Sequence, residues 1–418
     1  MIRTLRCLLC NKEILMSDLV RHKEDHPNER HYGIMWPLCF RTAESEAVNF
    51  MPPVHESKVL AEIIGVKKVF ILDEGRNISG SMKDYIVREA INLGLYEDCN
   101  AFTVVSSGNH AVSLAKFASA YHKKSVVFVP ASSSKIPFLA TFPSTLIIGL
   151  KDAIFEDTYV FANQVDLRGL YNANVSNDSL IVGFRPVAER IKELDPQPTH
   201  ILSGVGNGCY LAGICWGMGR FGDNLPKIIP VGMKGAFPVE EAFRTGLSII
   251  EYTEFLTDES AINAAEGSIA TSSYSMPQLI HAIKLSGGFP LGGLTNNDLG
   301  KAYRALLEDK NLLNNGVIPE PTGIMGLAAA LKHKDAFSRD SIILVSFTGH
   351  GVKDEAGIKK LVSPEISEVM IERAKKVRPD LITCQDSDTE NKGKVVFVDK
   401  DTSPDEINAQ IKGWIKGG

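Results

Sequence analysis

Apolar and polar residues follow two alternating patterns along most of this chain. Short apolar runs, of which Val69-Phe70-Ile71-Leu72 is one example, stand between longer stretches with the periodicity of helices. Short apolar runs between helices are typical of parallel strands that are buried on both faces. The pattern predicts strands at residues 67–72, 101–105, 125–129, 145–149, 200–202, 227–231 and 341–346. It predicts helices at residues 57–64, 82–94, 109–122, 134–141, 152–168, 183–194, 208–218, 276–285, 296–308 and 322–333.

The end of the chain carries a separate pattern. A polar stretch at residues 385–393 precedes Val395-Val396-Phe397-Val398, which predicts a strand. Ser403-Pro404-Asp405-Glu406 then has the residues of a helix start, with a serine cap, proline at the first helical position and a glutamate that completes a capping box. The helix after it presents one apolar stripe, made of Ile407, Ile411, Trp414 and Ile415. The stripe suits either core packing or a partner, and the sequence does not decide between them.

Composition describes an ordinary globular protein. The 418 residues are 44% hydrophobic and 23% charged, which allows about two to three domains with a well-buried core. A net charge of −5 gives no indication of nucleic-acid or anionic-membrane binding. We find no apolar run near the roughly 20 residues that span a bilayer, and no signal-peptide pattern at the start. Seven cysteines, an odd number in a long chain, are typical of reduced thiols, so we expect a cytoplasmic protein.

The first 30 residues contain a candidate metal site. Cys7 and Cys10 are followed, after eleven residues, by His22 and His26, which fall four apart on one face of a helix. Thiolates and imidazoles at such spacing suit tetrahedral zinc, and the set resembles a two-Cys two-His zinc finger. The alternative is a charged helix at residues 17–25 with incidental histidines and ordinary free cysteines. We expect a zinc-binding, structural or docking module.

Four turns rich in small residues carry the candidate chemistry. Ser79-Gly80-Ser81-Met82-Lys83-Asp84 places a lysine in the first turn of a predicted helix. Gly204-Val205-Gly206-Asn207-Gly208 follows a strand and opens a helix, an arrangement in which backbone N–H groups can hold an anion. The other two turns are Ser106-Ser107-Gly108-Asn109-His110 and Thr348-Gly349-His350-Gly351. Each alone has an ordinary explanation as a solvated lysine, a plain glycine turn or a helix cap.

Together and in this order, the four turns resemble the pyridoxal-phosphate enzymes of the tryptophan synthase β-subunit fold, and most closely threonine synthase. The resemblance extends from about Asn49 to Asp354. It implies an α/β fold with two three-layer α/β/α domains and mostly parallel sheets. We expect a zinc-finger-like module at 1–30, a large cofactor-binding domain at 31–84 and 183–380, a small mobile domain at 85–182, and a βα extension at 381–418.

The resemblance also implies a role for each turn. Lys83 would carry pyridoxal phosphate as a Schiff base and move protons at the substrate, and Asn109 would bond the 3′ oxygen of the ring. Thr348 would bond the ring nitrogen. The cofactor phosphate would bind the turn formed by Gly204, Val205, Gly206, Asn207 and Gly208. The substrate would contact Ser81, Ser107, Gly108 and Arg185, of which Arg185 suits a bidentate anion contact. His350 is expected to position or pack rather than to catalyse.

Departures from the family pattern bear on the substrate. The lysine segment is Ile78-Ser79-Gly80-Ser81-Met82-Lys83-Asp84-Tyr85, and Val182-Gly183-Phe184-Arg185-Pro186 replaces a motif that contains a glutamate and a lysine in the family. The resemblance implies elimination or replacement on an amino-acid phosphoester, as when threonine synthase converts O-phosphohomoserine and water to threonine and phosphate. The alternatives are β-replacement on a serine ester, as in cysteine or cysteate synthase, and a non-catalytic paralogue that serves as a binding scaffold. The expected partners are a small amino-acid substrate and, from family habit, a second copy of the chain; neither membrane nor nucleic acid is expected.

Overall fold

The computed structural model describes residues 4–7, 13–15, 34–35, 51–106, 108–133, 135–165, 167–175, 177–219, 224–246, 264–268, 275–382 and 392–416. The chain divides into two compact units. The first comprises Met1–Cys39, Phe50–Met82 and Phe184–Ile382, and the second comprises Phe40–Asn49, Lys83–Gly183 and Thr383–Gly418. Each unit is described below by itself. The expectation that residues 85–182 move as a domain stays a prediction.

The first unit is built on a six-stranded sheet with the strand order β12-β11-β10-β13-β5-β4. Neighbouring strands from β12 to β5 are parallel, and only β4 runs antiparallel to its neighbour. The buried apolar runs form the central strands, as the sequence pattern predicts for a sheet covered on both faces. The strands are β4 (Val54–Glu56), β5 (Lys68–Asp73), β10 (His200–Gly204), β11 (Lys227–Met233), β12 (Leu291–Leu294) and β13 (Ile342–Phe347).

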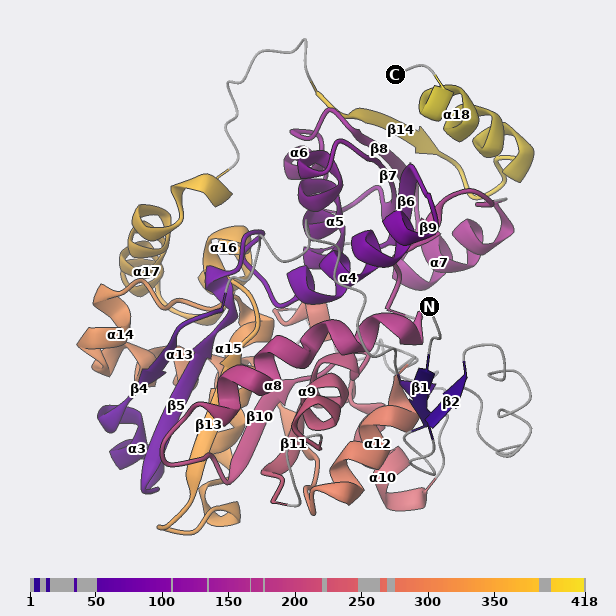
Figure 1. Ribbon diagram of the computed structural model, residues 1–418. Helices are drawn as coiled ribbons and strands as arrows, with labels where there is room; N and C mark the ends of the chain where they lie inside the picture. The colour runs from indigo at the N-terminus through magenta and orange to yellow at the C-terminus, as the bar shows by residue number, and fades with distance from the viewer. Residues whose placement is uncertain are drawn as a thin grey trace. The chain divides into compact units, whose positions relative to one another are not determined.

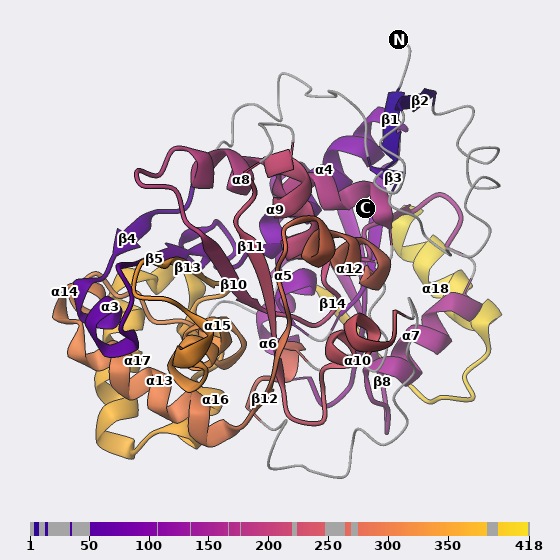
Figure 2. The same ribbon diagram turned by 90° about the horizontal axis from the view of Figure 1, so that it is seen from below.

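Two groups of helices cover the two faces of this sheet (Figures 1 and 2). One group contains α8 (Arg185–Lys192), α9 (Cys209–Gly219), α10 (Pro238–Thr245) and α12 (Met276–Leu285). The other contains α3 (Lys58–Ile64), α13 (Asn296–Glu308), α14 (Lys310–Asn314), α15 (Pro321–Lys332), α16 (Glu355–Leu361) and α17 (Pro364–Val377). The connections of this unit contain short 3₁₀ helices, which are η2 (Glu74–Arg76), η4 (Glu266–Ser268), η5 (Lys334–Ala336), η6 (Gly351–Lys353) and η7 (Pro379–Leu381).

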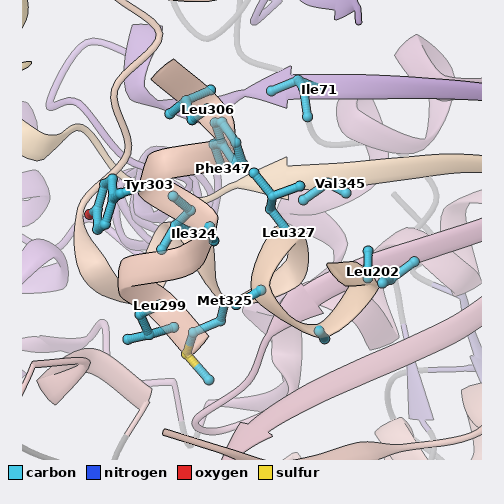
Figure 3. Packing of buried hydrophobic residues seen from close by; sticks show 14 of the residues in the cluster. Ile71, Leu202, Leu299, Tyr303, Leu306, Ile324, Met325, Leu327, Val345 and Phe347 are labelled. Atoms are coloured by element: carbon cyan, nitrogen blue, oxygen red, sulfur yellow. The ribbon is translucent and has the colours of Figure 1, made fainter. Parts of the chain in front are cut away.

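The main core of the first unit lies between its sheet and the second helix group. Figure 3 shows side chains of α13 and α15 packed against Ile71, Leu202 and Val345 from three neighbouring strands. Tyr303 is fully buried among them, and its hydroxyl donates to the carbonyl oxygen of Pro319 at 2.8 Å. Burial of these apolar side chains is the main contribution to the free energy that holds the helices against the sheet.

The second unit has a five-stranded parallel sheet with the order β14-β8-β7-β6-β9. Its strands are β6 (Ala101–Val105), β7 (Lys124–Pro130), β8 (Thr145–Leu150), β9 (Tyr171–Asn172) and β14 (Lys394–Val398). Its helices are α4 (Lys83–Tyr96), α5 (Asn109–Ala120), α6 (Ile136–Leu139), α7 (Phe155–Gln164) and α18 (Pro404–Lys416), with the 3₁₀ helix η3 (Asp178–Phe184) at the end of the segment. Side chains of α7 and α18 share one core with the sheet, and α4, α5 and α6 pack together in the other layer (Figure 1).

The C-terminal extension forms the predicted strand and helix, and its apolar stripe is core. β14 adds to the edge of the sheet in parallel with β8. Ile407 and Ile411 are buried in the same cluster as β7 and β8, and Trp414 and Ile415 pack against it. Lys124 donates to the carbonyl oxygens of Trp414 at 2.8 Å and Ile415 at 2.9 Å, which satisfies acceptors at the end of α18. The stripe is therefore covered within the second unit.

Most predicted elements of the body are confirmed, with boundaries that move by a few residues. The α/β fold with parallel sheets is confirmed as well. The sequence analysis missed the shorter or less apolar elements, which are β4, β9, β12, α10, α14, α16 and α17. Among the described residues, no helix combines the length and hydropathy needed to cross a bilayer.

The N-terminal residues that the structure describes form a small antiparallel sheet with the order β2-β1-β3. Its strands are β1 (Thr4–Cys7), β2 (Glu13–Leu15) and β3 (Ile34–Met35). Cys7 ends β1, whereas Cys10, His22 and His26 lie outside the described residues. No group of three or more His, Cys, Asp or Glu side chains that could hold a metal occurs within the described part of the chain. The zinc site stays a prediction.

Candidate functional site

Three neighbouring parallel strands of the first unit bring three of the four predicted turns to one edge of its sheet. β10 leads into residues 204–208, which we call the glycine loop, and β13 leads into the turn that begins at Thr348. β5 leads into residues 74–82, the lysine loop, which ends just before Lys83. Carboxyl ends of parallel strands meet at the same edge, and such edges are where α/β proteins bind ligands.

The lysine loop is joined to the Thr348 turn by backbone pairing. The N–H of Met82 donates to the carbonyl oxygen of Thr348 at 2.9 Å, and the N–H of His350 donates to that of Gly80 at 2.9 Å. Between these two bonds, Ser81 forms a β-bridge with Gly349. The residue that precedes Lys83 is therefore fixed directly to the turn that was predicted to hold the cofactor ring.

The lysine loop begins with a buried carboxylate. Glu74 is fully buried and accepts hydrogen bonds from the Tyr210 hydroxyl at 2.6 Å and from the Asn77 side-chain amide at 2.6 Å. The Tyr210 hydroxyl also lies 3.2 Å from Ser346 Oγ. Because Tyr210 belongs to α9 and Ser346 to β13, this network connects the lysine loop to the elements that carry the other two turns. A carboxylate is tolerated at such a position only when it is well paired.

The glycine loop is shaped by close backbone approaches. A Cβ on Gly204 would lie 2.9 Å from the Thr322 carbonyl oxygen, and one on Gly206 would lie 3.2 Å from that of Gly267. Gly208 has a φ of 87°, a conformation that favours glycine. The N–H of Val205 is used by Val231 within the sheet, at 3.0 Å. The amides from Gly206 onward stand at the start of α9, where the helix dipole favours an anion.

The fourth turn lies in the second unit, where α4 begins at Lys83 and α5 begins at Asn109. Ser113 donates to the Asp84 carboxylate at 2.6 Å, so the residue after Lys83 ties α4 to α5. Asn174 accepts from the N–H of Val105 at 2.7 Å, which holds the end of β6 just before the turn.

His110 is the second residue of α5 and is almost completely buried. Burial, and secondly the positive charge of the nearby Lys83, hold the pKa of His110 well below its usual range. The imidazole is therefore neutral at physiological pH. Its Nε2 atom is buried and has no hydrogen-bond partner among the described residues. An unsatisfied buried polar atom beside the predicted catalytic lysine is what a site for a bound polar group is expected to contain.

His350 is buried and neutral as well. Burial, followed by the positive charges of Arg378, Lys353 and Arg76, lowers its pKa to about 3. Its Nδ1 accepts from the N–H of Val352 at 3.4 Å. Its expected role in positioning stays a prediction.

The chain matches a protein-family model described as "Pyridoxal-phosphate dependent enzyme" over residues 48–349. The chain belongs to this family. It is 27% identical to the threonine synthase of Methanocaldococcus jannaschii over 326 residues, which are 75% of this chain and 77% of that protein. It is 26% identical to the threonine synthase of Methanosarcina acetivorans over 355 residues, 81% of this chain and 83% of that protein.

Solved structures show the same fold. The processed form of threonine deaminase isoform 2 from Solanum lycopersicum superimposes with a TM-score of 0.62 at 17% identity, over 78% of this chain and 84% of that one. This likeness supports the fold of the body and not a particular substrate.

Taken one unit at a time, the residues present fit parts of a pyridoxal-phosphate group. In the second unit, Lys83 can supply the amine that the cofactor aldehyde requires. In the first unit, the glycine loop leaves its backbone open as a cradle, because a Cβ would clash with the backbone at Gly204 and crowd it at Gly206. The orphaned Nε2 of His110 offers a further polar contact on the Lys83 side. Thr348 is buried at the end of β13. The assignment of individual roles to these residues stays a prediction.

Two predicted substrate residues need comment. Ser107 lies outside the described residues. Arg185 begins α8 and its Nε donates to the Glu189 carboxylate at 2.8 Å, in a partly exposed pair on one helix. A substrate anion would have to compete with Glu189 for this guanidinium.

The sequence analysis missed Glu74, which begins the lysine loop, and Tyr210 and Arg378, which donate hydrogen bonds to it. Glu74 directly follows an apolar strand, and an acidic residue at that position of the sequence was the one available signal. Nothing in the local sequence pairs it with Tyr210, which lies 136 residues further along the chain.

Gly80→Ala is expected to destabilise the protein more than Gly65→Ala. Both glycines have a positive φ, of 76° and 86°, so each alanine costs about 1–2 kcal/mol of backbone strain. A Cβ at Gly80 would also overlap Leu381, whereas none of the described atoms lies within 4 Å of the corresponding position at Gly65. Overpacking of this kind typically costs a further 1–3 kcal/mol, roughly. Denaturant unfolding of the two variants measures the difference, and equal losses would show that the close approach is unimportant.

His350 should make stability fall on acidification. The unfolded imidazole takes up a proton below its ordinary pKa of 6.5, whereas the folded one does so only near a pKa of about 3, so the unfolded state binds more protons between these values. This contribution to stability is present above pH 6.5 and is lost at about 1.4 kcal/mol per pH unit below it. His350→Asn keeps an acceptor for Val352 but does not titrate. Its unfolding free energy should therefore drop by about 2 kcal/mol less than that of the wild type between pH 7 and pH 5; parallel curves would contradict the assignment.

Proposed function

We propose that this protein is a pyridoxal-phosphate-dependent enzyme of the threonine synthase type, which converts O-phosphohomoserine and water to threonine and phosphate. The observation that carries the proposal is the backbone pairing of the Lys83 segment with the Thr348 turn, in a chain similar to threonine synthases over three quarters of its length. The broader assignment to elimination chemistry on an amino acid has the wider support. The phosphoester substrate is the specific part of the proposal.

The bound cofactor supplies an electron sink that weakens the C–H bonds of the amino acid. Lys83 would hold the cofactor at rest and then, with its amine released, carry a proton to and from the substrate carbon. Backbone amides of the glycine loop would bind the cofactor phosphate, and Asn109 and Thr348 would orient the ring. Ser81, Ser107 and Gly108 would hold the substrate carboxylate.

Two further residues extend this scheme. His110 is neutral, because burial and then the charge of Lys83 hold its pKa well below the usual range, so it would present an uncharged ring beside the lysine. Arg185 would bind the phosphate of the substrate by exchanging its contact with Glu189 for the substrate anion, which its planar guanidinium can hold in a bidentate manner.

Other reactions remain as alternatives that the same experiment separates. β-Replacement on a serine ester requires a phosphate to leave the β-carbon instead of the γ-carbon. Deamination of threonine, the activity in the name of the solved structural neighbour, would release ammonia without phosphate. A paralogue that has become a scaffold would turn over none of these substrates. The homodimer and the cytoplasmic location stay predictions.

Purified protein should show a visible absorbance band from bound cofactor, which Lys83→Ala should lose and the exposed-site control Lys123→Ala should keep. Addition of O-phosphohomoserine should release phosphate and threonine in equal amounts, with no ammonia. Phosphate release from O-phosphoserine instead would favour β-replacement, and ammonia from threonine would favour deamination. A cofactor band that none of these amino acids alters would contradict the proposal.

We further propose that Cys7, Cys10, His22 and His26 bind one zinc ion in a small structural module. The support is the spacing of the four side chains in the sequence, together with the antiparallel pairing of β1 with β2, in which Cys7 ends the first strand. Freshly purified protein should contain about one zinc per chain. Cys7→Ser should lose it and Cys99→Ser, a control in the second unit, should keep it. Protein without zinc would refute the module.

A further inference from the structure

We propose that Arg378 is a positioning residue for the reaction, which acts together with Lys353 by holding the carbonyl groups of the lysine loop. The proposal rests on the function proposed above, because its role in catalysis requires Lys83 to be the reacting lysine. The two side chains, which we call the cation clamp, lie in the first unit with the loop that they contact.

The guanidinium of Arg378 uses all five of its N–H donors, three on carbonyl groups of the lysine loop and two on Asp380. Nη1 donates to the carbonyl oxygens of Gly75 and, at 2.9 Å, Asn77; Nη2 donates to that of Ile78 at 3.1 Å. The remaining donors form a bidentate pair with Asp380, from Nε at 2.9 Å and Nη2 at 2.8 Å. Arg378 is 8% exposed, and its bonds to Gly75 and Asn77 are buried, whereas the side chain of its partner Asp380 is half exposed. Five donors and five acceptors leave the guanidinium fully satisfied.

Lys353 continues the same row of contacts. Its Nζ donates to the Ser79 carbonyl oxygen at 3.0 Å, and the next carbonyl, that of Gly80, accepts from the N–H of His350. Leu381, three residues after Arg378, would be overlapped by a Cβ at Gly80, which also has a positive φ. The carbonyl groups of Gly75 and of the four residues from Asn77 to Gly80 are thus held by two cations and one backbone amide.

The loop needs such contacts because it lies between two regular elements and belongs to neither. Carbonyl groups in β5 are bonded to β13, and those in α4 are bonded within the helix, but an irregular buried connection must find other donors. Arg378 supplies three of them from one rigid planar group. An error in the path of this loop would be passed on to Met82 and to the backbone of Lys83, and displacements of about 1 Å can cost roughly 100-fold in rate.

The clamp lies outside the part of the chain that the family model matches. That match ends at residue 349, whereas Lys353 and Arg378 come after it, in η6 and at the end of α17. Arg378 stands at the C-terminal boundary of α17, and the chain continues through η7 to Ile382, where the first unit ends. The segment after the matched region therefore has a function for the site, which its sequence position would not indicate.

The test compares Arg378→Met and Arg378→Lys with the wild type and with Arg373→Met. Arg373 lies on the same helix and donates to the side chain of Asn314 and not to a carbonyl of the lysine loop, so it controls for loss of an arginine from α17. Lysine at 378 keeps a positive charge beside Asp380 but offers three donors in place of five, so Arg378→Lys should fold and still loosen the loop.

The first readout is hydrogen exchange of the cofactor-free protein, followed by mass spectrometry of peptides that cover residues 74–82. Exchange there should be at least about 10-fold faster in Arg378→Met than in the wild type. The acceleration should be smaller but measurable in Arg378→Lys, and Arg373→Met should exchange at the wild-type rate. Peptides from α18 in the second unit serve as the internal reference. Unchanged exchange in the loop, or equal acceleration throughout the first unit, would overturn the proposal.

The second readout is steady-state kinetics with O-phosphohomoserine. Because Arg378 contacts the loop and not the substrate, kcat should fall roughly 10- to 100-fold in Arg378→Met while KM changes little. A loosened loop with unchanged kcat would refute the role in the reaction. If the wild type turns over no amino acid, the proposed function fails, whereas the exchange experiment still decides whether Arg378 holds the loop.

Discussion

The hydrogen bond from Met82 to Thr348 is the interaction on which the candidate site depends. It joins the residue before Lys83 to the turn that follows β13, and the register of β13 and β5 makes it possible. In that register Phe347 lies opposite Asp73, so both strands end at the same level of the sheet. A slip of one residue would turn the side chains of one strand to the opposite faces and would separate Met82 from Thr348. The register of the two strands thus sets the position of the lysine loop.

The charged side chains in and around the lysine loop are tolerated because each of them is paired. Glu74 accepts from Tyr210 and Asn77, and Arg378 forms a bidentate pair with Asp380. Asp73 also lies here; burial raises its pKa to about 6, although the Arg76 guanidinium acts in the opposite direction. A half-satisfied network would cost more than an apolar core. The network is useful because hydrogen bonds are directional. They fix the path of an irregular loop, which apolar contacts do not.

Much of the fold was accessible from the sequence, and the site only in part. Apolar runs predicted the central strands because parallel strands covered on both faces exclude polar residues, and the capping box at Ser403 predicted α18. Glycine spacing and Lys83 indicated the four turns because the conformation of a turn depends mainly on the residues within it. Arg378 could not be found in this way: its partners are carbonyl groups some 300 residues earlier in the chain, and backbone carbonyls leave no mark in a sequence.

The division of the chain places Lys83 at a boundary. Met82 is the last residue of a segment of the first unit, and Lys83 begins a segment of the second. On one side, the bond to Thr348 holds Met82. On the other, Asp84 binds Ser113 and so ties the start of α4 to α5, the helix that begins with Asn109 and His110. The role proposed for Lys83 requires its amine to bind and release a partner in each turnover, and fixing the backbone on both sides would confine that motion to the side chain.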